Sequence, residues 1–245
     1  MNSERYIIVL AGGIGTRFGS SLGKQYETIA DKPILVWTVE RYLDLFAIEN
    51  IVVVINRNHL LLWKGLTNEY QHLKGIKTVI GGSQRFHSVR NALCEITCAE
   101  NDLIGVHDGV RPFVSVTTIQ RAYTTAALHG SGVPVFDSVN TLRIKNDNGN
   151  YAVDRATIKE VQNPQVFRAS MIKKAYRQIY EASFLDDATV VEADGNKIYL
   201  CEGNYENIKI THPQDLYMAE GLIRFYHTDL SDNGTLRHNK RFSAI

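Results

Sequence analysis

The sequence has little of what marks disulfide-rich, nucleic-acid-binding or membrane proteins. Only three of its 245 residues are cysteine, a sparse and odd number that indicates a reducing compartment. Its 27 Lys and Arg nearly balance its 26 Asp and Glu, so nothing in the net charge argues for a broad basic face that binds nucleic acid. No apolar run reaches the roughly 18 residues that cross a bilayer, and the first six residues, with Glu4 and Arg5, do not resemble a signal peptide. We expect a cytoplasmic protein that binds neither nucleic acid nor membrane.

The cysteines also give little support for a metal centre. Cys94 and Cys98 could lie on one helix face, but no nearby histidine or cysteine pair completes the four ligands of a structural zinc site. We therefore expect Cys94 and Cys98 to be buried or partly buried thiols.

What the sequence does contain is an alternation of short apolar runs with longer amphipathic stretches. The runs expected to form strands are Tyr6–Leu10, Ile51–Ile55, Ile76–Ile80, Leu103–His107, Gly132–Val135 and Ile198–Cys201. The stretches expected to form helices are Ile34–Leu45, Ser88–Ile96, Val116–Leu128, Ala169–Tyr180 and about Thr211–Tyr226. This order predicts an α/β fold in which helices flank a mostly parallel sheet. We expect one domain over residues 1–226 and a polar tail over residues 227–245.

One segment departs from the alternation. Between Thr141 and Gln162 two β-like arms flank a turn rich in Asn, Asp and Gly. A lone hairpin is only marginally stable in water. We therefore expect this arm, at about residues 138–162, to pack against something else, such as a second subunit.

The first chemistry-bearing segment follows the first predicted strand. It is a glycine-rich loop over residues 10–25, in which Arg17 and Lys24 supply positive charge. Glycines let backbone N–H groups approach a phosphate, and open α/β sheets bind ligands at the carboxyl edge of their strands. The loop matches neither the dinucleotide fingerprint, since Phe18 replaces its third glycine, nor the Walker loop, since Gln25 follows Lys24. It is either a nucleotide-binding loop of another kind or a glycine-rich turn with two solvated cations.

A second group follows the fourth predicted strand. Asp108 stands at the carboxyl end of that strand, where a carboxylate can bind a hard cation such as Mg²⁺, and Arg111 could pair with an anion. The same two residues could instead form a structural ion pair within a turn. We expect His107 to be a buried hydrogen-bonding residue.

Three further features are weaker on their own. A turn over residues 80–88 suits close backbone contact with a ligand, although any tight strand-to-helix turn looks similar. Lys209 precedes the last helix, where a lysine is usually solvated, and Arg155 on the hairpin could reach an anion across a subunit boundary. Together, the cations and the single carboxylate predict a phosphate-rich substrate with a metal.

These motifs resemble those of a known family, the 2-C-methyl-D-erythritol 4-phosphate cytidylyltransferases of the non-mevalonate isoprenoid pathway. The resemblance covers about residues 5–225, and its motifs occur in the order typical of the family. They are Ala11–Arg17, Gly23–Tyr26, Gly81–Gly82, Val106–Pro112, Val153–Arg155, Pro164–Gln165 and Asn207–Thr211. Ribitol-5-phosphate cytidylyltransferases share most of them.

The resemblance implies a Rossmann-like nucleotidyltransferase fold and a homodimer joined through the protruding β-arm. It also implies Mg²⁺ as a cofactor and transfer of a cytidylyl group from CTP to an acceptor phosphate, with release of pyrophosphate. The acceptor phosphate would attack the α-phosphorus in line, so positioning and cations would supply most of the catalysis.

The resemblance also assigns roles to single residues. Arg17 and Lys24 match the pair that stabilises the transition state, and Asp108 matches the Mg²⁺ residue. Arg155 and Lys209 match the pair that positions the acceptor phosphate, with Arg155 offered to the partner's site. The positions that match CTP-binding residues are Ala11, Gly12, Gly13, Gly81, Gly82, Ser83 and Ser88. The positions that fall near the acceptor are Asp108, Arg111, Ser138, Arg155 and Lys209.

Three positions depart from the pattern of the family. Gly23 replaces the usual proline before the lysine, and Asn163 replaces the usual threonine before Pro-Gln. Leu185 stands where a threonine hydroxyl would contact the acceptor phosphate, and leucine cannot form a hydrogen bond there. These changes concern the acceptor more than the nucleotide.

Three functional hypotheses follow. The first is an enzyme that makes 4-diphosphocytidyl-2-C-methyl-D-erythritol, and the alternative is the same chemistry on ribitol 5-phosphate. The third is a catalytically idle nucleotide-binding protein, which predicts damage to Arg17, Lys24 or Asp108. All three residues are present.

Overall fold

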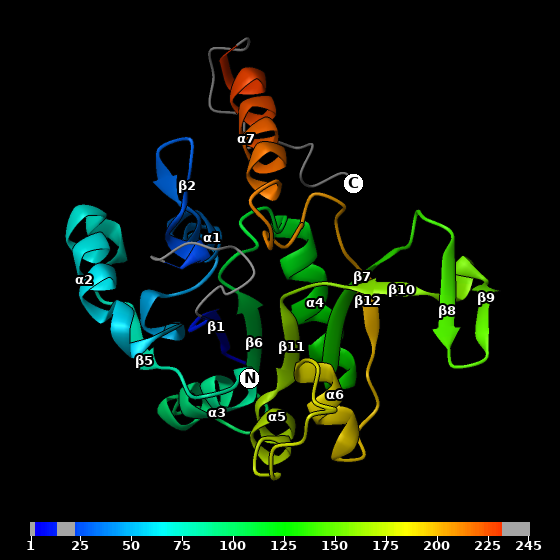
Figure 1. Ribbon diagram of the computed structural model, residues 1–245. Coiled ribbons are helices and arrows are strands. Elements are labelled where there is room, and N and C mark those ends of the chain that lie inside the picture. The colour runs from blue at the N-terminus through cyan, green and yellow to red at the C-terminus, as the bar shows by residue number, and fades with distance from the viewer. Residues whose placement is uncertain (1–2, 14–22, 232–245) are drawn as a thin grey trace.

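The computed structural model describes residues 3–13 and 23–231, and its centre is an eight-stranded sheet (Figure 1). Seven strands lie in the order β10-β7-β11-β6-β1-β4-β5, and β12 pairs with β7. In the middle of the sheet β1 is parallel to both β6 and β4, and β4 is parallel to β5. These four strands are β1 (Arg5–Ala11), β4 (Ile51–Ile55), β5 (Lys77–Ile80) and β6 (Leu103–Asp108). Their carboxyl ends therefore meet at one edge of the sheet.

The other half of the sheet is built around an antiparallel strand. β11 (Gln165–Arg168) lies between β6 and β7 (Ser131–Asp137) and runs opposite to both, so β7 is parallel to β6. β10 (Lys159–Val161) pairs with β7 in antiparallel fashion, and β12 (Leu200–Glu202) pairs with it in parallel. The prediction of a mostly parallel sheet is confirmed. β10 and β11 were not predicted, because three or four residues hold too few apolar positions to show a pattern.

Helices cover both faces of the sheet, because successive side chains of a strand point to opposite faces. On one face Ile7 and Val9 pack against the first group of helices, and on the other Tyr6 and Ile8 pack against the second. The first group is α1 (Ile34–Leu43), α2 (Leu60–Glu69) and α4 (Val116–His129). The second is α3 (Arg85–Glu95), α5 (Ala169–Ala175) and α6 (Asp187–Ala193). Burial on both faces explains why the strands read as continuous apolar runs.

A third, smaller core lies beyond the carboxyl edge. It joins α7 (Asp215–Ser231) to Val110 and Phe113, which follow β6, and to Ile29. Ile29 belongs to a small hairpin formed by β2 (Thr28–Ile29) and β3 (Lys32–Pro33). The C-terminal helix is therefore anchored next to the turn that follows β6.

The five predicted helices form, but the ends of all five differ from the prediction. The smaller differences are that α1 ends at Leu43 instead of Leu45, α3 spans Arg85–Glu95 instead of Ser88–Ile96, and α4 ends at His129 instead of Leu128. α7 ends at Ser231 instead of about Tyr226. α5 ends at Ala175 instead of Tyr180, and the ring of Tyr176 stacks on Phe86. α7 begins at Asp215, not near Thr211, because the Asp215 carboxylate accepts the backbone N–H groups of Thr211 and His212 and closes a turn there. α2 and α6 were not predicted. α6 has only seven residues, and in α2 an exposed leucine, Leu61, blurs the amphipathic pattern.

The predicted hairpin is present as a separate two-stranded sheet. β8 (Leu142–Asn146) and β9 (Gly149–Val153) pair with each other and project from the side of the molecule (Figure 1). Two large side chains on it, Ile144 and Tyr151, are 45% and 52% exposed. The arm therefore has an apolar surface that the rest of the described chain leaves accessible.

The cysteines differ in part from expectation. Cys98 is partly buried, which confirms the prediction for this residue, and Cys201 is partly buried too. Cys94 is exposed, so the prediction of a buried or partly buried thiol is wrong for Cys94. Cys94 lies on the outer side of α3. Among the helices of residues 3–13 and 23–231, none is both long enough and apolar enough to cross a membrane.

The crossing of β7 and α4 gives a test of the fold. A Cβ added at Gly132 would clash with the carbonyl oxygen of Ala122 and lie 3.0 Å from the amide nitrogen of Ala126. We expect Gly132→Ala to lower the free energy of unfolding by about 2 kcal/mol or more, measured by urea denaturation. The control is Gly65→Ala on α2, where an added Cβ meets nothing within 4 Å. The control should be unchanged or up to about 1 kcal/mol more stable. Equal stability of Gly132→Ala and wild type would contradict this packing.

Candidate active site

The centre of the site is the carboxylate of Asp108, which ends β6 and is only 8% exposed. Lys209 Nζ lies 2.8 Å from Asp108 Oδ2, and Arg111 Nε lies 3.6 Å from the same oxygen. Arg85 Nε approaches the other oxygen, Oδ1, at 3.7 Å. One buried carboxylate thus gathers three cations that come from α3, from the turn after β6 and from the loop before α7.

The charges of this group are strongly coupled. Burial alone would raise the pKa of Asp108, but Lys209, Arg85 and Arg111 hold that pKa well below its ordinary value, so the carboxyl is ionised. Burial lowers the pKa of Arg111, while the Asp108 carboxylate opposes this effect. Asp187 also pairs with Arg85, so the three cations face two carboxylates and still leave an excess of positive charge in a small volume. Such a group is suited to binding a phosphate.

Backbone and side-chain hydrogen bonds hold these segments together. Arg111 Nη1 donates to the carbonyl oxygen of Asn207 at 2.8 Å, and Asn207 Nδ2 donates to the carbonyl oxygen of Asn163 at 2.7 Å. The loop that carries Lys209 is therefore tied to the turn after β6 and to the start of β11. His107 is fully buried, and its Nε2 lies 3.0 Å from the carbonyl oxygen of Arg111. Burial lowers the pKa of His107 to about 4, and the expectation of a buried hydrogen-bonding histidine is confirmed.

Two glycine turns meet at the same edge. A Cβ built at Gly12 would lie 3.5 Å from Ser88 Oγ and 3.8 Å from Gly81 Cα, so the turn after β1 touches the turn after β5. Ser88 Oγ accepts the backbone N–H of Gly82 at 3.1 Å, and Ser83 Oγ lies 3.0 Å from His87 Nδ1. The chain thus brings together the residues from Ala11 to Gly13 with the turn from Gly81 to Ser88. That they bind CTP stays a prediction.

Lys24 is placed next to this meeting point by its neighbour. The buried side chain of Gln25 donates through Nε2 to the carbonyl oxygens of Ala11, at 2.9 Å, and Gly13, at 3.0 Å. Lys24 begins the short 3₁₀ helix η1 (Lys24–Tyr26), so this pair of bonds fixes it beside the end of β1. Arg17, predicted to act with Lys24, lies outside the described residues.

The remaining predicted residues lie farther along the sheet edge. Val166 of β11 is level with both Gly105 of β6 and Gly132 of β7, so the end of β7 lies two strands away from Asp108. Ser138 follows β7 and is buried. Arg155 is exposed and lies near the same strand end, where its Nη1 donates to the carbonyl oxygen of Val139 at 2.9 Å. Ser138 and Arg155 are therefore neighbours.

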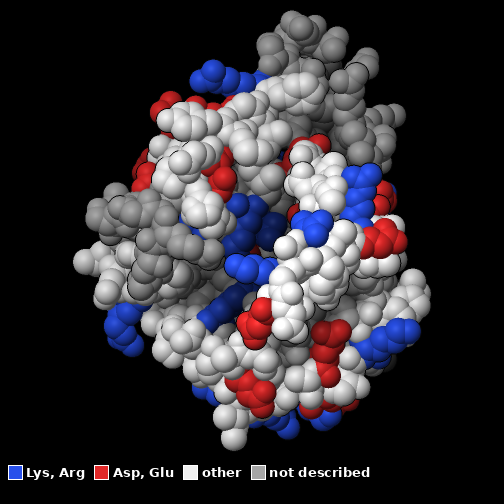
Figure 2. Space-filling model, turned by 45° about the vertical axis from the view of Figure 1, so that its right-hand side comes forward, with Lys and Arg blue, Asp and Glu red and all other residues white. Residues whose placement is uncertain are grey.

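Basic side chains are also concentrated in one place on the molecular surface. Figure 2 shows lysine and arginine side chains in a hollow near the centre of one face, with acidic side chains at several places around it. A basic hollow in a chain of formal net charge +1 means that positive charge is concentrated locally.

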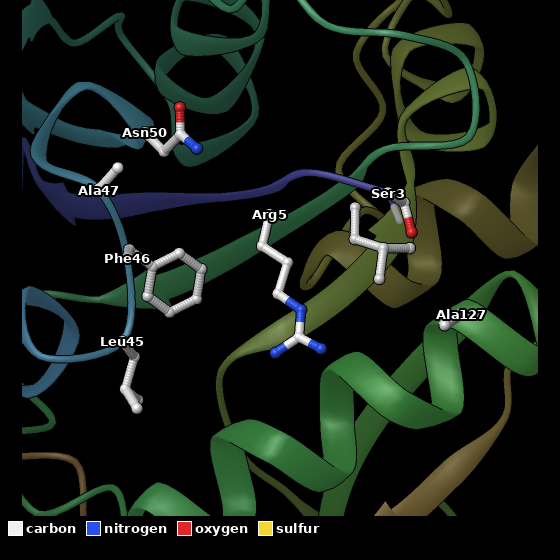
Figure 3. Close-up of a pocket in the computed structure, with 8 residues that line it drawn as sticks. Ser3, Arg5, Leu45, Phe46, Ala47, Asn50 and Ala127 are labelled. Carbon is white, nitrogen blue, oxygen red and sulfur yellow. The ribbon is translucent and has the colours of Figure 1, made fainter. Parts of the chain in front are cut away.

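A separate cavity of about 520 Å³ lies at the opposite edge of the sheet (Figure 3). Arg5 and Leu103, which begin β1 and β6, line it together with Phe46 and Asn50. The Arg5 guanidinium points into this space (Figure 3) and lies 5.8 Å from the centre of the Tyr123 ring. Because β1 and β6 are parallel and in register, this cavity is separated from the Asp108 group by the length of the strands.

Two residues of the site were in motifs that the sequence singled out but received no role. Arg85 stands in the turn over residues 80–88, and Gln25 follows Lys24. Their signal was position alone: a cation three residues after a glycine pair, and an amide at the end of the glycine-rich loop. Nothing in the sequence indicated which groups they would contact.

The described residues do not form a dedicated metal cage. Within residues 3–13 and 23–231, no group of three or more His, Cys, Asp or Glu side chains is placed to hold a metal. Asp108 supplies a single carboxylate, and its Oδ2 already contacts Lys209. Magnesium commonly binds one or two carboxylates together with substrate phosphates. The site therefore fits an ion that arrives with a phosphorylated ligand.

Comparison with known proteins agrees with the geometry. The family model described as 2-C-methyl-D-erythritol 4-phosphate cytidylyltransferase matches residues 6–225. A protein of that name from Bacteroides thetaiotaomicron is 43% identical over 220 residues, which are 90% of this chain and 100% of that protein. The crystal structure of the enzyme of that name from Thermus thermophilus matches with a TM-score of 0.71 and 31% identity, over 90% of this chain and 99% of the other.

A longer protein also matches. The bifunctional protein from Campylobacter jejuni has a TM-score of 0.74 and 29% identity over 88% of this chain. The match covers 54% of that protein. The same fold therefore also occurs as one part of a larger chain.

The contacts of Gln25 give a test of how the site is assembled. Gln25→Glu keeps the size of the side chain but replaces a double donor with an acceptor that faces two carbonyl oxygens. We expect the melting temperature to fall by about 4 °C or more, because one buried and one partly buried hydrogen bond are lost and a carboxylate is left unpaired. Gln120→Glu on the exposed side of α4 is the matched control and should melt within about 1 °C of wild type. A Gln25→Glu variant with the melting temperature of wild type would show that these hydrogen bonds do not hold the turn.

Proposed function

Because this chain belongs to the 2-C-methyl-D-erythritol 4-phosphate cytidylyltransferase family, we propose that it transfers a cytidylyl group from CTP to 2-C-methyl-D-erythritol 4-phosphate. The products would be 4-diphosphocytidyl-2-C-methyl-D-erythritol and pyrophosphate. The observation that carries the proposal is the group of three cations around Asp108, at the edge where the two glycine turns meet. Such an arrangement can hold two phosphorylated substrates close together.

The reaction is a displacement at phosphorus. An oxygen of the acceptor phosphate forms a new bond to the α-phosphorus of CTP, while the bond from that phosphorus to the β-phosphate oxygen breaks and pyrophosphate leaves with the electron pair. Negative charge spreads over the phosphoryl oxygens in the transition state. Fixed cations lower the barrier by stabilising that charge and by holding the two substrates in line.

We assign the cations to the two substrates as follows. Lys24, which is held beside the end of β1, binds the triphosphate of CTP together with Arg17. Lys209 binds the acceptor phosphate. Its side chain is 39% exposed, so its ammonium group can leave Asp108 and bind a phosphate, which carries more negative charge than a carboxylate. Arg111 is more buried and stays with Asp108. This division is supported by position and matches the roles that the resemblance implies.

Mg²⁺ is proposed as the metal of the reaction, with Asp108 as its protein ligand. When bound, the ion would neutralise part of the charge of the triphosphate. The fit depends on Lys209 leaving Asp108 Oδ2, which the exchange described above provides. Arg85 and Arg111 would keep the carboxylate ionised in either arrangement.

The acceptor is proposed from the relatives. The relatives from Bacteroides thetaiotaomicron and Thermus thermophilus both carry the name 2-C-methyl-D-erythritol 4-phosphate cytidylyltransferase. Leu185, which stands where a threonine is usual, is 78% exposed and supplies no hydrogen bond to a phosphate. Acceptor phosphate binding in this chain would therefore depend more heavily on Lys209 and Arg155.

A homodimer through the arm is also proposed. The support is the exposed apolar surface of β8 and β9 and the place of Arg155 at the base of that arm. Pairing of two arms would bury this surface and could carry Arg155 toward the site of the second subunit. The cytoplasmic location inferred from the cysteine content stays a prediction.

Pyrophosphate release with CTP and Mg²⁺ tests the reaction. We expect turnover with 2-C-methyl-D-erythritol 4-phosphate and much slower turnover with ribitol 5-phosphate. Lys24→Ala should lower kcat by about 100-fold or more, because a charge-stabilising group is lost. Lys64→Ala, an exposed lysine on α2, is the control and should keep wild-type activity. A wild-type protein that releases pyrophosphate only with ribitol 5-phosphate would move the assignment to that acceptor.

Mixed dimers test whether sites are shared. Arg155→Ala should mainly raise the KM for the acceptor, since its proposed contact is with the acceptor phosphate. In a dimer of one Arg155→Ala chain and one Lys24→Ala chain, one site would still have both residues, so up to half of the wild-type activity should return. Verified mixed dimers without any recovery would count against a shared site.

A further inference from the structure

Arg85 connects Asp108 to a second buried carboxylate, that of Asp187. Its Nη1 and Nη2 donate to Asp187 Oδ1 and Oδ2 at 2.9 and 2.6 Å, and its Nε lies 3.7 Å from Asp108 Oδ1. Asp187 is the first residue of α6 and is completely buried. One guanidinium thus bridges the carboxylates of Asp108 and Asp187, which are 79 residues apart in sequence.

The Asp187 end of this bridge is rigid. Both oxygens of Asp187 accept from the fork of Arg85, and Oδ1 also accepts the hydroxyl of Tyr176 at 2.6 Å. Burial, and then the carboxylate itself, raise the pKa of Tyr176, so its hydroxyl stays a donor. A bidentate pair between a planar guanidinium and a carboxylate fixes the plane of the guanidinium as well as its distance.

Aromatic packing holds the same elements together. Phe86, the residue after Arg85, stacks on Tyr176 with ring centres 4.8 Å apart and on Phe184 with centres 5.6 Å apart. The start of α3 is therefore packed against the segment between α5 and α6. Arg85 has little freedom to turn away from Asp187 without breaking this cluster.

The Asp108 end of the bridge has the opposite character. Its distance of 3.7 Å is that of an ion pair and not of a hydrogen bond, and the other oxygen of Asp108 faces Lys209 and Arg111. Arg85 thus opposes the pull of the other two cations on the carboxylate. Without it, the Asp108 carboxylate could turn about its contact with Lys209.

We infer that Arg85 is a positioning residue for the proposed reaction: the Tyr176–Asp187 pair fixes its guanidinium, and the guanidinium fixes the orientation of Asp108. This inference rests on the proposed function. Its chemical consequence is that Lys209 is presented to the acceptor phosphate in one geometry. Asp187 and Tyr176 then influence catalysis without touching a substrate.

A double-mutant cycle between Arg85 and Asp187 tests the chain of contacts. Arg85→Lys keeps the charge but cannot span both carboxylates, and Asp187→Asn keeps the shape but loses the bidentate ion pair. We expect each change to lower kcat/KM for the acceptor by about 10-fold or more, with the KM for CTP changed by less than about threefold. Because both changes break the same bridge, the kcat/KM of the double variant for the acceptor should lie within about threefold of that of Arg85→Lys alone.

A milder pair of variants covers the case in which Asp187→Asn does not fold. Tyr176→Phe removes the hydroxyl on Asp187 and keeps the ring that stacks on Phe86, while Tyr180→Phe removes a hydroxyl from a neighbouring ring of the same cluster. We expect Tyr176→Phe to lower acceptor kcat/KM by about threefold and Tyr180→Phe to have no effect. Arg177→Lys, an exposed arginine just after α5, is the control for Arg85→Lys.

The outcomes separate three accounts. Loss of acceptor kcat/KM in both single variants without further loss in the double variant supports the positioning role. Lower melting temperatures with wild-type kcat/KM would show a structural role only, and a large effect of Arg85→Lys with full activity in Asp187→Asn would show that Arg85 binds substrate directly; both results would overturn the inference. A wild-type protein without turnover would refute the proposed function instead, which keeps the two failures distinct.

Discussion

The site depends on one buried carboxylate. Asp108 lies at the end of a central parallel strand and holds Lys209, Arg111 and Arg85 within 4 Å of its oxygens. Like charges this close repel one another strongly where water is scarce, so three cations can share such a volume only with a counter-charge among them. With Arg85 fixed by Asp187, the Asp108 carboxylate therefore determines where Lys209 and Arg111 are placed before any ligand binds.

The fold explains how distant segments reach this carboxylate. Parallel pairing of β1 with β4 and β6 brings the turn after each strand to one edge, and β11 lets the chain return between β6 and β7. Residues in the loop before α7 are then tied to the turn after β6 through Arg111 and Asn207. Binding groups come from loops, while the sheet beneath them supplies the rigidity.

Part of this could be predicted from the sequence and part could not. The buried strands were readable because burial on both faces requires continuous apolar runs, as in Ile51–Ile55. Lys24, Asp108 and Lys209 were found because they stand in motifs beside glycines or strand ends. The partners of Arg85 were not predictable, because Asp187 is 102 residues away along the chain and only the tertiary packing of α3 on α6 brings them together. Short strands such as β11 were not predicted, because they hold too few residues to show a pattern. The burial of Cys94 was predicted wrongly, because the exposed side of α3 had not been identified.

The most direct test of the central role of Asp108 is the affinity for the acceptor phosphate without metal. Calorimetry in buffer with a chelator would compare wild type with Asp108→Asn, a change that removes a negative charge from a site for anions. If the carboxylate organises Lys209 and Arg111, the variant binds 2-C-methyl-D-erythritol 4-phosphate about 10-fold more weakly despite its greater positive charge. Tighter binding by the variant would show that the cations need no organiser, and it would contradict the dependence of the site on this carboxylate.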